Sequence, residues 1–431
     1  MEKQRLHIFN RDNHIVIYDI KTMDLFIGDN LNKKNIEQLS NQTFRCTAYN
    51  SSIVNEYRNC DKKAMRRVTI CVSNDCNLRC KYCYAHGGDY GKKRTLMTKK
   101  TARDIVNFCI NNFSRIDSIM FFGGEPLLNY KIIEYICEEF KLAARTSSFN
   151  IPLFSIVTNG TLYNEEILNL IKKHISHITV SIDGAKSIND TNRVFKNGTG
   201  TYNRITEFIN LCKECSSIKL EYEATYTIDH INMGITRSEV HSSIHSSFGI
   251  NGVVVDEDKL GKEAIYQCLK NATDDEIMRT NFDCLPSDFW QVVLAMINKT
   301  PNKFCGIFDD RITLTTDGGI VGCQMLIESD NNIISSIYNT NAISEINNHI
   351  KEFKDNQSCK NCWCCDICGG CVVQKFASKN NIKLNNEPNV DSCQITQLCI
   401  EEILYIISRL KKDQKLWTLF AQKLKNKYTY N

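Results

Sequence analysis

The stretch SNDCNLRCKYCYAHGG, residues 73–88, places three cysteines within eight positions. Cys76, Cys80 and Cys83 are separated by three residues and then by two. Thiolates this close together bind soft metal ions or iron–sulfur clusters. A structural zinc site would need a fourth ligand to close its tetrahedron, and His86 is the nearest candidate. The spacing therefore predicts a metal centre and leaves both zinc and an iron–sulfur cluster open.

The composition excludes several classes of protein. Hydrophobic residues make up 42% and charged residues 24% of the 431 positions, and the net charge of +4 is too small to indicate a nucleic-acid partner. Charges interrupt every apolar run of the N-terminus, and no stretch approaches the roughly 20 apolar residues of a membrane span. We therefore expect a cytoplasmic protein with no membrane or nucleic-acid partner. In that reducing compartment, 22 cysteines indicate metal or redox chemistry rather than disulfides.

The pattern of apolar residues predicts four regions. Residues 1–65 carry the alternating runs LHIF, HIVIYDI and DLFIG, which predict a small β-rich domain with an antiparallel sheet, followed by a polar helix around NKKNIEQLSN. In residues 66–300, strands alternate with helices, which predicts an α/β fold, a partial (β/α)6 TIM-like barrel of about six parallel strands. Residues 301–400 form a Cys-rich module, and 401–431 predict a C-terminal helix.

Distinctive short motifs follow the predicted strands of the barrel. The cysteine loop comes after the first strand, and GGEP, TNG and SIDG end the next three. Ligands of such folds bind at the carboxyl ends of the strands, so these motifs are expected to line one mouth. In GGEP, paired glycines allow a ligand to approach the backbone closely, and Glu125 complements an ammonium group.

The CxxxCxxC spacing, with the aromatic Tyr82 before its last cysteine, resembles the signature of the radical S-adenosylmethionine (SAM) enzymes. The resemblance implies a [4Fe-4S] cluster on Cys76, Cys80 and Cys83, with one iron open to SAM. It further implies a set of SAM contacts around the same mouth. These are Tyr82 at the adenine, Gly123, Gly124, Glu125 and Pro126 at the methionine amino group, Asn159, Ser181 and Asp183 at the ribose and amino-acid part, and Arg193 at the methionine carboxylate.

The C-terminal cysteines resemble the SPASM extension of these enzymes, which holds two auxiliary [4Fe-4S] clusters. The resemblance assigns an outer cluster to Cys359, Cys362, Cys368 and Cys393, and an inner cluster to Cys305, Cys323 and Cys371. The sequence departs from the pattern in two ways. Only two residues precede the sixth cysteine where relatives have three, and no cysteine soon after Cys305 supplies a fourth inner ligand. Either Cys364, Cys365 or another residue completes the inner cluster, or its iron is open to a peptide thiol; zinc remains the alternative for this module.

Among SPASM enzymes the chain most resembles peptide maturases that act on cysteine-rich ribosomal peptides, through the phrase CYAHGGDYGKKRTLM. The resemblance implies a radical SAM oxidoreductase that forms thioether bridges from cysteine sulfur to carbon. Its partners would be a precursor peptide, with a leader and a Cys-containing core, and an electron donor such as flavodoxin or ferredoxin. Residues 1–65 are a candidate leader-binding domain because a sheet edge accepts a peptide strand, with a structural cap as the alternative.

Three other functions are compatible with the sequence. Other SPASM maturases form carbon–carbon crosslinks, and nothing in the chain excludes this. Sulfatase-type relatives make formylglycine, but their branch places an aspartate after the second SPASM cysteine, where this chain has Gln324. A zinc-stabilised peptide-binding protein without catalysis is the alternative from a different class.

Overall fold

The computed structural model describes residues 2–28, 43–45, 63–248, 253–257, 261–302, 305–354, 357–369, 371–377, 384–385 and 387–428. The polar helix predicted around NKKNIEQLSN lies outside the described residues. None of the described helices has the length and apolar character needed to cross a membrane.

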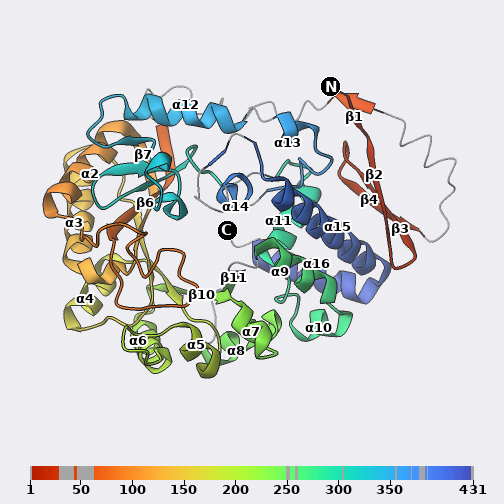
Figure 1. The fold of residues 1–431 in the computed structure, drawn as a ribbon, viewed down its shortest axis with the longest axis horizontal. Coiled ribbons are helices and arrows are strands. Elements are labelled where there is room, and N and C mark those ends of the chain that lie inside the picture. Colours follow the sequence, from red (N-terminus) through yellow and green to blue (C-terminus); the bar gives the residue numbers. More distant parts are fainter. Residues whose placement is uncertain are drawn as a thin grey trace.

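Parallel strands in chain order build the barrel, as the alternating sequence pattern predicts (Figure 1). Each strand of the series pairs in parallel with the next along the chain. Within the described residues the series comprises β6 (Lys63–Ser73), β7 (Phe113–Gly123), β8 (Leu153–Thr158), β9 (His177–Ser181), β10 (Lys219–Tyr226) and β11 (Val253–Glu257). The predicted α/β partial barrel is confirmed.

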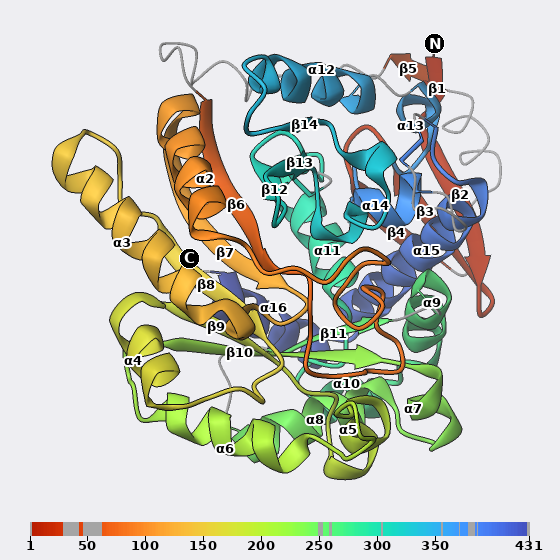
Figure 2. The ribbon, with the colours of Figure 1, turned by 60° about the vertical axis from the view of Figure 1, so that its left-hand side comes forward.

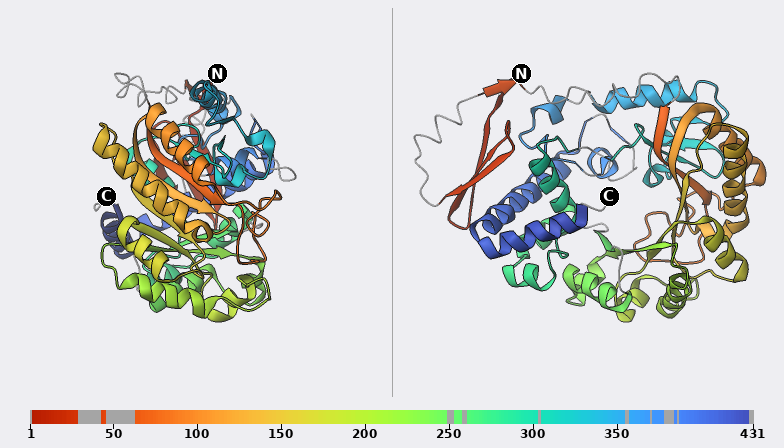
Figure 3. Two further views of the ribbon diagram at one scale, coloured as in Figure 1. Left: turned by 90° about the vertical axis from the view of Figure 1, so that its left-hand side faces the viewer. Right: turned by 180° about the vertical axis from the view of Figure 1, so that it is seen from behind.

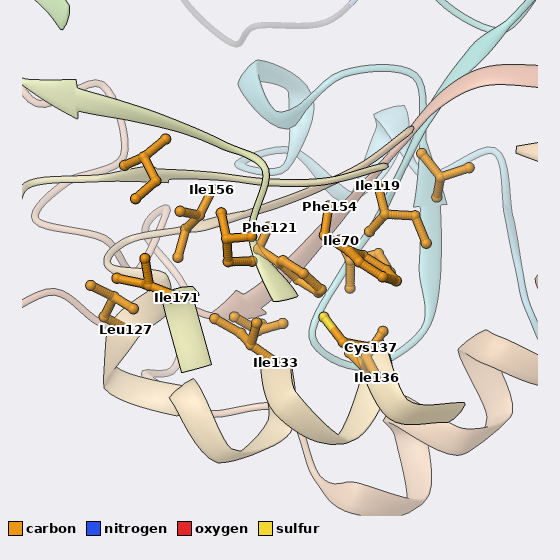
Figure 4. Packing of buried hydrophobic residues seen from close by; sticks show 14 of the residues in the cluster. Ile70, Ile119, Phe121, Leu127, Ile133, Ile136, Cys137, Phe154, Ile156 and Ile171 are labelled. Atoms are coloured by element: carbon orange, nitrogen blue, oxygen red, sulfur yellow. The ribbon is translucent and has the colours of Figure 1, made fainter. Parts of the chain in front are cut away.

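Amphipathic helices cover the outer face of this sheet. Their local signals are clear: Thr98 caps α2 (Lys99–Asn112), and Asn164 caps α4 (Glu165–His174) by accepting from the Ile167 N–H. The remaining barrel helices are α3 (Tyr130–Thr146), α5 (Lys186–Asn192), α6 (Tyr202–Lys213), α7 (Ile228–Asn232) and α8 (Arg237–Phe248). Figure 4 shows how α3 packs on the strands, with Ile133 and Ile136 of the helix pointing toward the buried side chains of the sheet, among them Phe121. Burial of these side chains fixes the strands whose ends carry the site.

A second core lies beside the barrel and joins residues from both ends of the chain. The N-terminal sheet of β2 (Leu6–Arg11), β3 (His14–Asp19) and β4 (Asp24–Gly28) packs on the long helix α15 (Val390–Lys412). The other helices of this core are α9 (Gly261–Asn271), α10 (Asp274–Arg279), α11 (Ser287–Asn298) and α16 (Gln414–Tyr428). The N-terminal sheet and the barrel helices thus lie at opposite sides of the molecule (Figure 3). A short ladder pairs β1 (Glu2–Gln4) with β5 (Thr43–Arg45).

The Cys-rich module begins as an extension of the barrel sheet. Strand β12 (Arg311–Leu314) pairs in parallel with β6, and β13 (Gly319–Val321) and β14 (Ser335–Ser336) follow at the edge. Figure 2 shows β12 and β13 beside β6. The rest of the module consists of short helices: η3 (Gln324–Leu326), η4 (Asp330–Asn332), α12 (Ala342–Lys354), α13 (Gln357–Asn361) and α14 (Val372–Phe376). The module is therefore continuous with the barrel rather than a separate appendage.

Candidate active site at the carboxyl ends of the strands

The cysteine loop after β6 is folded around one arginine. The Arg79 guanidinium donates through Nη1 to the carbonyl oxygens of Cys76, Leu78 and Gly87, at 3.1, 2.5 and 3.3 Å. Two backbone N–H groups of the same loop point at sulfur: Leu78 N lies 3.4 Å from Cys76 Sγ, and Gly87 N lies 3.3 Å from Cys83 Sγ. The loop therefore supplies hydrogen bonds to thiolates from its own backbone.

Close backbone contact with the GGEP turn holds this loop in place. A Cβ on Gly124 would lie 2.4 Å from the Asp75 carbonyl oxygen and 2.6 Å from Gly88 Cα. The N–H groups of Gly124 and Glu125 donate to the carbonyls of Ser73 and Asp75, both at 2.9 Å. The paired glycines thus serve a backbone-to-backbone approach, because any side chain here would push the two turns apart.

The donor set of the loop fits an iron–sulfur cluster. Burial raises the pKa of Cys76 to about 12 and that of Cys80 to about 11, so a metal centre is needed to hold them as thiolates at neutral pH. Among the described residues, no three His, Cys, Asp or Glu side chains converge on a single ion position. A [4Fe-4S] cluster takes one thiolate per iron, so its ligands need not converge. His86, the candidate zinc ligand, is half-exposed with Nε2 3.1 Å from Glu328 Oε1.

The Glu125 carboxylate is completely buried and joins the ends of β7 and β8. One oxygen accepts from Leu127 N at 3.0 Å and Thr158 Oγ1 at 2.8 Å, and the other accepts from Asn159 N at 2.8 Å. Burial raises the pKa of Glu125 to about 7, although these hydrogen bonds oppose the shift. These contacts hold the turn in place, and the role of Glu125 at the methionine amino group stays a prediction. Pro126 is buried and begins the helix η2 (Pro126–Asn129).

The Asn159 side chain links the end of β8 to the cysteine loop. Its Nδ2 donates to Asn77 Oδ1 at 2.9 Å and lies 3.7 Å from Cys76 Sγ. Its Oδ1 accepts from the N–H and hydroxyl of Thr161, at 2.9 and 2.6 Å. The third strand end therefore contacts the first cysteine directly.

A buried triad brings the end of β9 to the other side of the loop. Asp183 accepts from the Tyr82 hydroxyl at 2.8 Å and from Arg193 Nε at 3.0 Å. The Thr225 N–H of β10 donates to the same carboxylate at 3.1 Å. The Arg193 guanidinium lies 5.4 Å from the centre of the Tyr82 ring, so the ring also faces the cation. Ser181, the last residue of β9, is half-buried and pairs with Glu223 across the ladder.

The predicted site residues of the barrel are thus brought together at one mouth, and several further residues hold them there. Sequence reasoning missed Arg79, Thr158 and Thr225 as residues that hold the site. Arg79 lies inside the cysteine loop and Thr158 begins TNG, whereas Thr225 lies in no motif. The roles of all these residues toward SAM and a cluster remain predictions.

The C-terminal thiols form two groups. Burial raises the pKa of Cys323 to about 12, and nearby Cys371 and Cys305 add to the shift. Burial likewise raises the pKa of Cys359 to about 11, with contributions from nearby thiols. Those contributing thiols are Cys368, Cys393 and Cys362. This grouping matches the inner and outer sets implied by the SPASM resemblance, while the clusters themselves remain predictions.

Cys364 lies with the outer group. Its Sγ is 3.5 Å from Cys362 Sγ, and hydrogen bonding from Cys364 is the main cause that lowers the pKa of Cys362 to about 6. The buried Lys375 donates to Cys368 Sγ, and Gln397 Nε2 lies 3.4 Å from Cys362 Sγ. Cys364 is therefore placed as a neighbour of outer ligands rather than as the missing inner ligand.

Comparison with known proteins identifies the barrel. Residues 70–232 match the Radical SAM superfamily. This part of the chain is a radical SAM domain. The match supports SAM and a [4Fe-4S] cluster as the ligands of this domain.

The relatives differ in how much of their length is matched. The uncharacterized protein MJ0907 of Methanocaldococcus jannaschii is 40% identical over 137 residues, which are 31% of this chain and 44% of that protein. The chain thus spans less than half of this relative. The radical SAM cyclopropyl synthase TigE of Paramaledivibacter caminithermalis is 21% identical over 378 residues, covering 75% of this chain and 74% of TigE.

A solved structure shares the fold. Native anSMEcpe with bound AdoMet and Cp18Cys peptide superposes with a TM-score of 0.60 at 20% identity, covering 80% of this chain and 99% of that one. The likeness extends beyond the barrel into the Cys-rich region, in agreement with the continuous sheet described above.

Proposed function

We propose that the chain is a radical SAM peptide maturase that forms thioether bridges from cysteine sulfur to carbon in a ribosomally made peptide. The observation that carries the proposal is the pairing of the strand-end site with a second, three-thiol group close to it. A small hydrophobic cluster joins the two: Cys83 packs against a cluster that contains Tyr90 and Val321, and Val321 precedes Cys323 by two residues. A substrate held between them would face both thiol groups.

The residues of the mouth have distinct parts in this proposal. Cys76, Cys80 and Cys83 hold the cluster, and the Tyr82–Asp183–Arg193 triad and Asn159 orient SAM and exclude water. When bound, SAM and its cluster supply a 5′-deoxyadenosyl radical that takes a hydrogen atom from a substrate carbon. The reducing electron would come from a donor such as flavodoxin or ferredoxin.

The inner thiol group is the reason for proposing a thioether bond. Cys305, Cys323 and Cys371 form a set of three, Cys364 lies instead with the outer thiols, and we propose that Cys365, the other candidate, does not complete the set either. A three-thiol set leaves one coordination position for a cysteine of the peptide, which would bring that sulfur to the substrate carbon. The peptide bound in the anSMEcpe structure supports a peptide as the substrate class. The N-terminal sheet, whose edges are β2 and β4, would receive a leader segment.

One observation favours a second candidate, the formation of carbon–carbon bonds in a peptide. TigE, which matches three quarters of this chain, is named a cyclopropyl synthase, and a cyclopropyl ring requires a new carbon–carbon bond. Formylglycine formation has weaker support, because Gln324 occupies the position after Cys323 and its Oε1 accepts from the Cys323 thiol at 3.5 Å.

The first experiment is anaerobic. The wild type and the Cys76→Ala/Cys80→Ala/Cys83→Ala variant are reconstituted, reduced with dithionite, given SAM, and assayed for 5′-deoxyadenosine and for iron and sulfide. Cys215→Ala, a half-exposed thiol that contacts Ser217, is the matched control. We expect 5′-deoxyadenosine from the wild type and the control only. A zinc-containing wild type that produces none would overturn the proposal.

The second experiment identifies the bond. A cysteine-containing precursor peptide encoded beside the gene is incubated with the enzyme, and the product is treated with iodoacetamide. A thioether removes two hydrogen atoms and one alkylatable thiol per bridge. A carbon–carbon crosslink removes two hydrogen atoms and leaves every thiol reactive, and this result would establish the second candidate instead.

A further inference from the structure

Two arginines lie beside the inner thiol group, one on each side of the junction between the barrel and the Cys-rich module. Arg311 of β12 is the register partner of Arg67 of β6. Cys305 precedes Gly306, whose carbonyl accepts from the Arg311 N–H at 2.9 Å. Val321 of β13 pairs with Thr313, so Cys323, two residues after Val321, continues the register to Arg311. Arg311 therefore lies between two of the inner thiols, Cys305 before it in the chain and Cys323 after it.

Neither guanidinium has a carboxylate partner among the described residues. Asp310 is the nearest acidic side chain in sequence, but it is engaged by Arg66, whose Nε lies 2.8 Å from Asp310 Oδ2. The Nε of Arg311 is buried and makes no hydrogen bond within the described part of the chain. The Nη1 of Arg67 lies 3.9 Å from the thioether sulfur of Met120.

This arrangement is unfavourable unless an anion is present. Both side chains are only partly accessible, and two like charges stand opposite each other on neighbouring strands. Burial, with Arg311 and Arg66 adding to it, lowers the pKa of Arg67 to about 10, which still leaves it charged at neutral pH. Thiolates of Cys305 and Cys323 bound to iron would supply the missing negative charge, because the chain brings both residues to Arg311.

We propose that Arg67 and Arg311 are the counter-charges of an anionic iron–sulfur cluster on Cys305, Cys323 and Cys371, and that they raise its reduction potential. The inference rests on the proposed function, which places a cluster at these thiols. Positive charge beside a cluster favours the reduced state, since that state carries one more electron. The two arginines thereby make the inner site a better one-electron acceptor than the same three cysteines alone.

The test is a potentiometric titration followed by electron paramagnetic resonance. It uses the reconstituted Cys76→Ala/Cys80→Ala/Cys83→Ala chain, so that only auxiliary clusters are observed. Arg67→Met and Arg311→Met remove the charges, Arg67→Lys and Arg311→Lys keep them, and Arg66→Gln is the control on the neighbouring exposed arginine. Each Met variant should make reduction of one of the two clusters about tenfold less favourable, a shift of about 59 mV for one electron. The Lys variants and Arg66→Gln should shift the same couple much less.

The outcomes separate this inference from the proposed function. If the chain binds iron for only one auxiliary cluster and shows only one redox couple, it has no inner cluster. Both this inference and the proposed function would then be wrong. Two clusters with potentials unchanged in every arginine variant would overturn the inference alone. Unchanged potentials, together with a raised KM for the peptide when the same arginine variants are made in the chain that keeps Cys76, Cys80 and Cys83, would assign the arginines to a substrate carboxylate instead. If a Met variant loses its cluster, the Lys variants decide. A potential lowered by about 59 mV in Arg67→Lys or Arg311→Lys, which keep the charge, contradicts a role for charge, whereas a shift no larger than that of Arg66→Gln supports it.

Discussion

The chain builds its two thiol regions by opposite means. Residues 74–91 form a contiguous loop in which Arg79 and backbone N–H groups of the loop contact carbonyls and sulfurs of the same segment. The C-terminal thiols come from separate segments: the turns before β12 and after β13, helix α13 and the stretch between α13 and α14, and the first turn of α15. The first region depends on backbone clearances within one motif, whereas the second depends on docking of distant elements. The predictions below either break this contrast or sharpen it.

The largest effect should come from a side chain placed at Gly124, where two backbone segments pack closely against each other. In Gly124→Ala the new Cβ would lie 2.4 Å from the Asp75 carbonyl and 2.6 Å from Gly88 Cα, and both obstacles are backbone atoms. The cysteine loop must move, so we expect loss of loop-bound iron and roughly a 100-fold fall in 5′-deoxyadenosine formation. Iron analysis and the anaerobic assay measure these two quantities.

The control stays in the same loop. Gly91, unlike Gly124, has a positive φ of 69°, but a Cβ there would meet nothing within 4 Å. Asparagine tolerates this conformation, so Gly91→Asn should retain iron and activity. Equal losses in both variants would show that the loop needs glycine flexibility in general, and the clearance argument would be wrong.

The next effect concerns the buried triad at the mouth. Asp183→Asn leaves the buried Arg193 without its counter-charge, which should lower the free energy of unfolding by about 3–5 kcal/mol. Asp183→Leu/Arg193→Met removes both charges and should cost clearly less. Urea unfolding of the metal-free chains measures the difference. A double variant as unstable as Asp183→Asn would contradict the ion-pair explanation.

Much of this contrast was visible in the sequence, because local motifs carry local information. Strand–helix alternation predicts the barrel, and the glycines and cysteines predict which strand ends form the site. The contact of β12 with β6 joins segments 244 residues apart, from Arg67 to Arg311, and no spacing or periodicity signals it. The sequence also leaves open which thiols Cys364 joins, because Cys362, Cys364 and Cys365 lie within four positions of the chain.

The pH dependence of the free energy of unfolding tests the first region, the cysteine loop with its GGEP turn, without displacing the loop. Burial raises the pKa of Glu125 from its ordinary 4.5 to about 7 in the folded state. The stability that Glu125 contributes to the folded chain is therefore fully present below about pH 4.5. It is lost as the pH rises through about 7, which lowers the free energy of unfolding by about 3 kcal/mol. Cys76 is the titratable neighbour that Glu125 affects, and burial keeps its thiol protonated throughout this range.

The measurement compares slopes rather than absolute stabilities. The free energy of unfolding of the wild type should fall more steeply between pH 4.5 and 7 than that of Glu125→Gln. Glu166→Gln, at the exposed start of α4, should retain the wild-type slope. Parallel curves for the wild type and Glu125→Gln would mean that Glu125 is not protonated in the folded chain at mid-range pH.

The smallest effect belongs to the second region and tests its dependence on docking. Trp363, between two outer thiols, stacks on His7 of β2 with ring centres 3.6 Å apart and planes 3° from parallel. His7 Nε2 also lies 2.8 Å from Glu401 Oε1 of α15. His7→Ala removes both contacts, so the N-terminal sheet should be released more easily, at a cost of about 1 kcal/mol.

Hydrogen exchange of β2 and β3 should then accelerate while 5′-deoxyadenosine formation is unchanged, because no contact of His7 reaches the mouth. Phe26→Ala is the matched control, since Phe26 lies on the same sheet but is 54% exposed. Faster exchange in both variants would mean that any truncation loosens the sheet. Faster exchange in His7→Ala alone, extending to the turn around Trp363, would show that the outer thiol turn and the N-terminal sheet hold each other in place. That result would sharpen the contrast, since exchange in the cysteine loop of the barrel should not respond to either change.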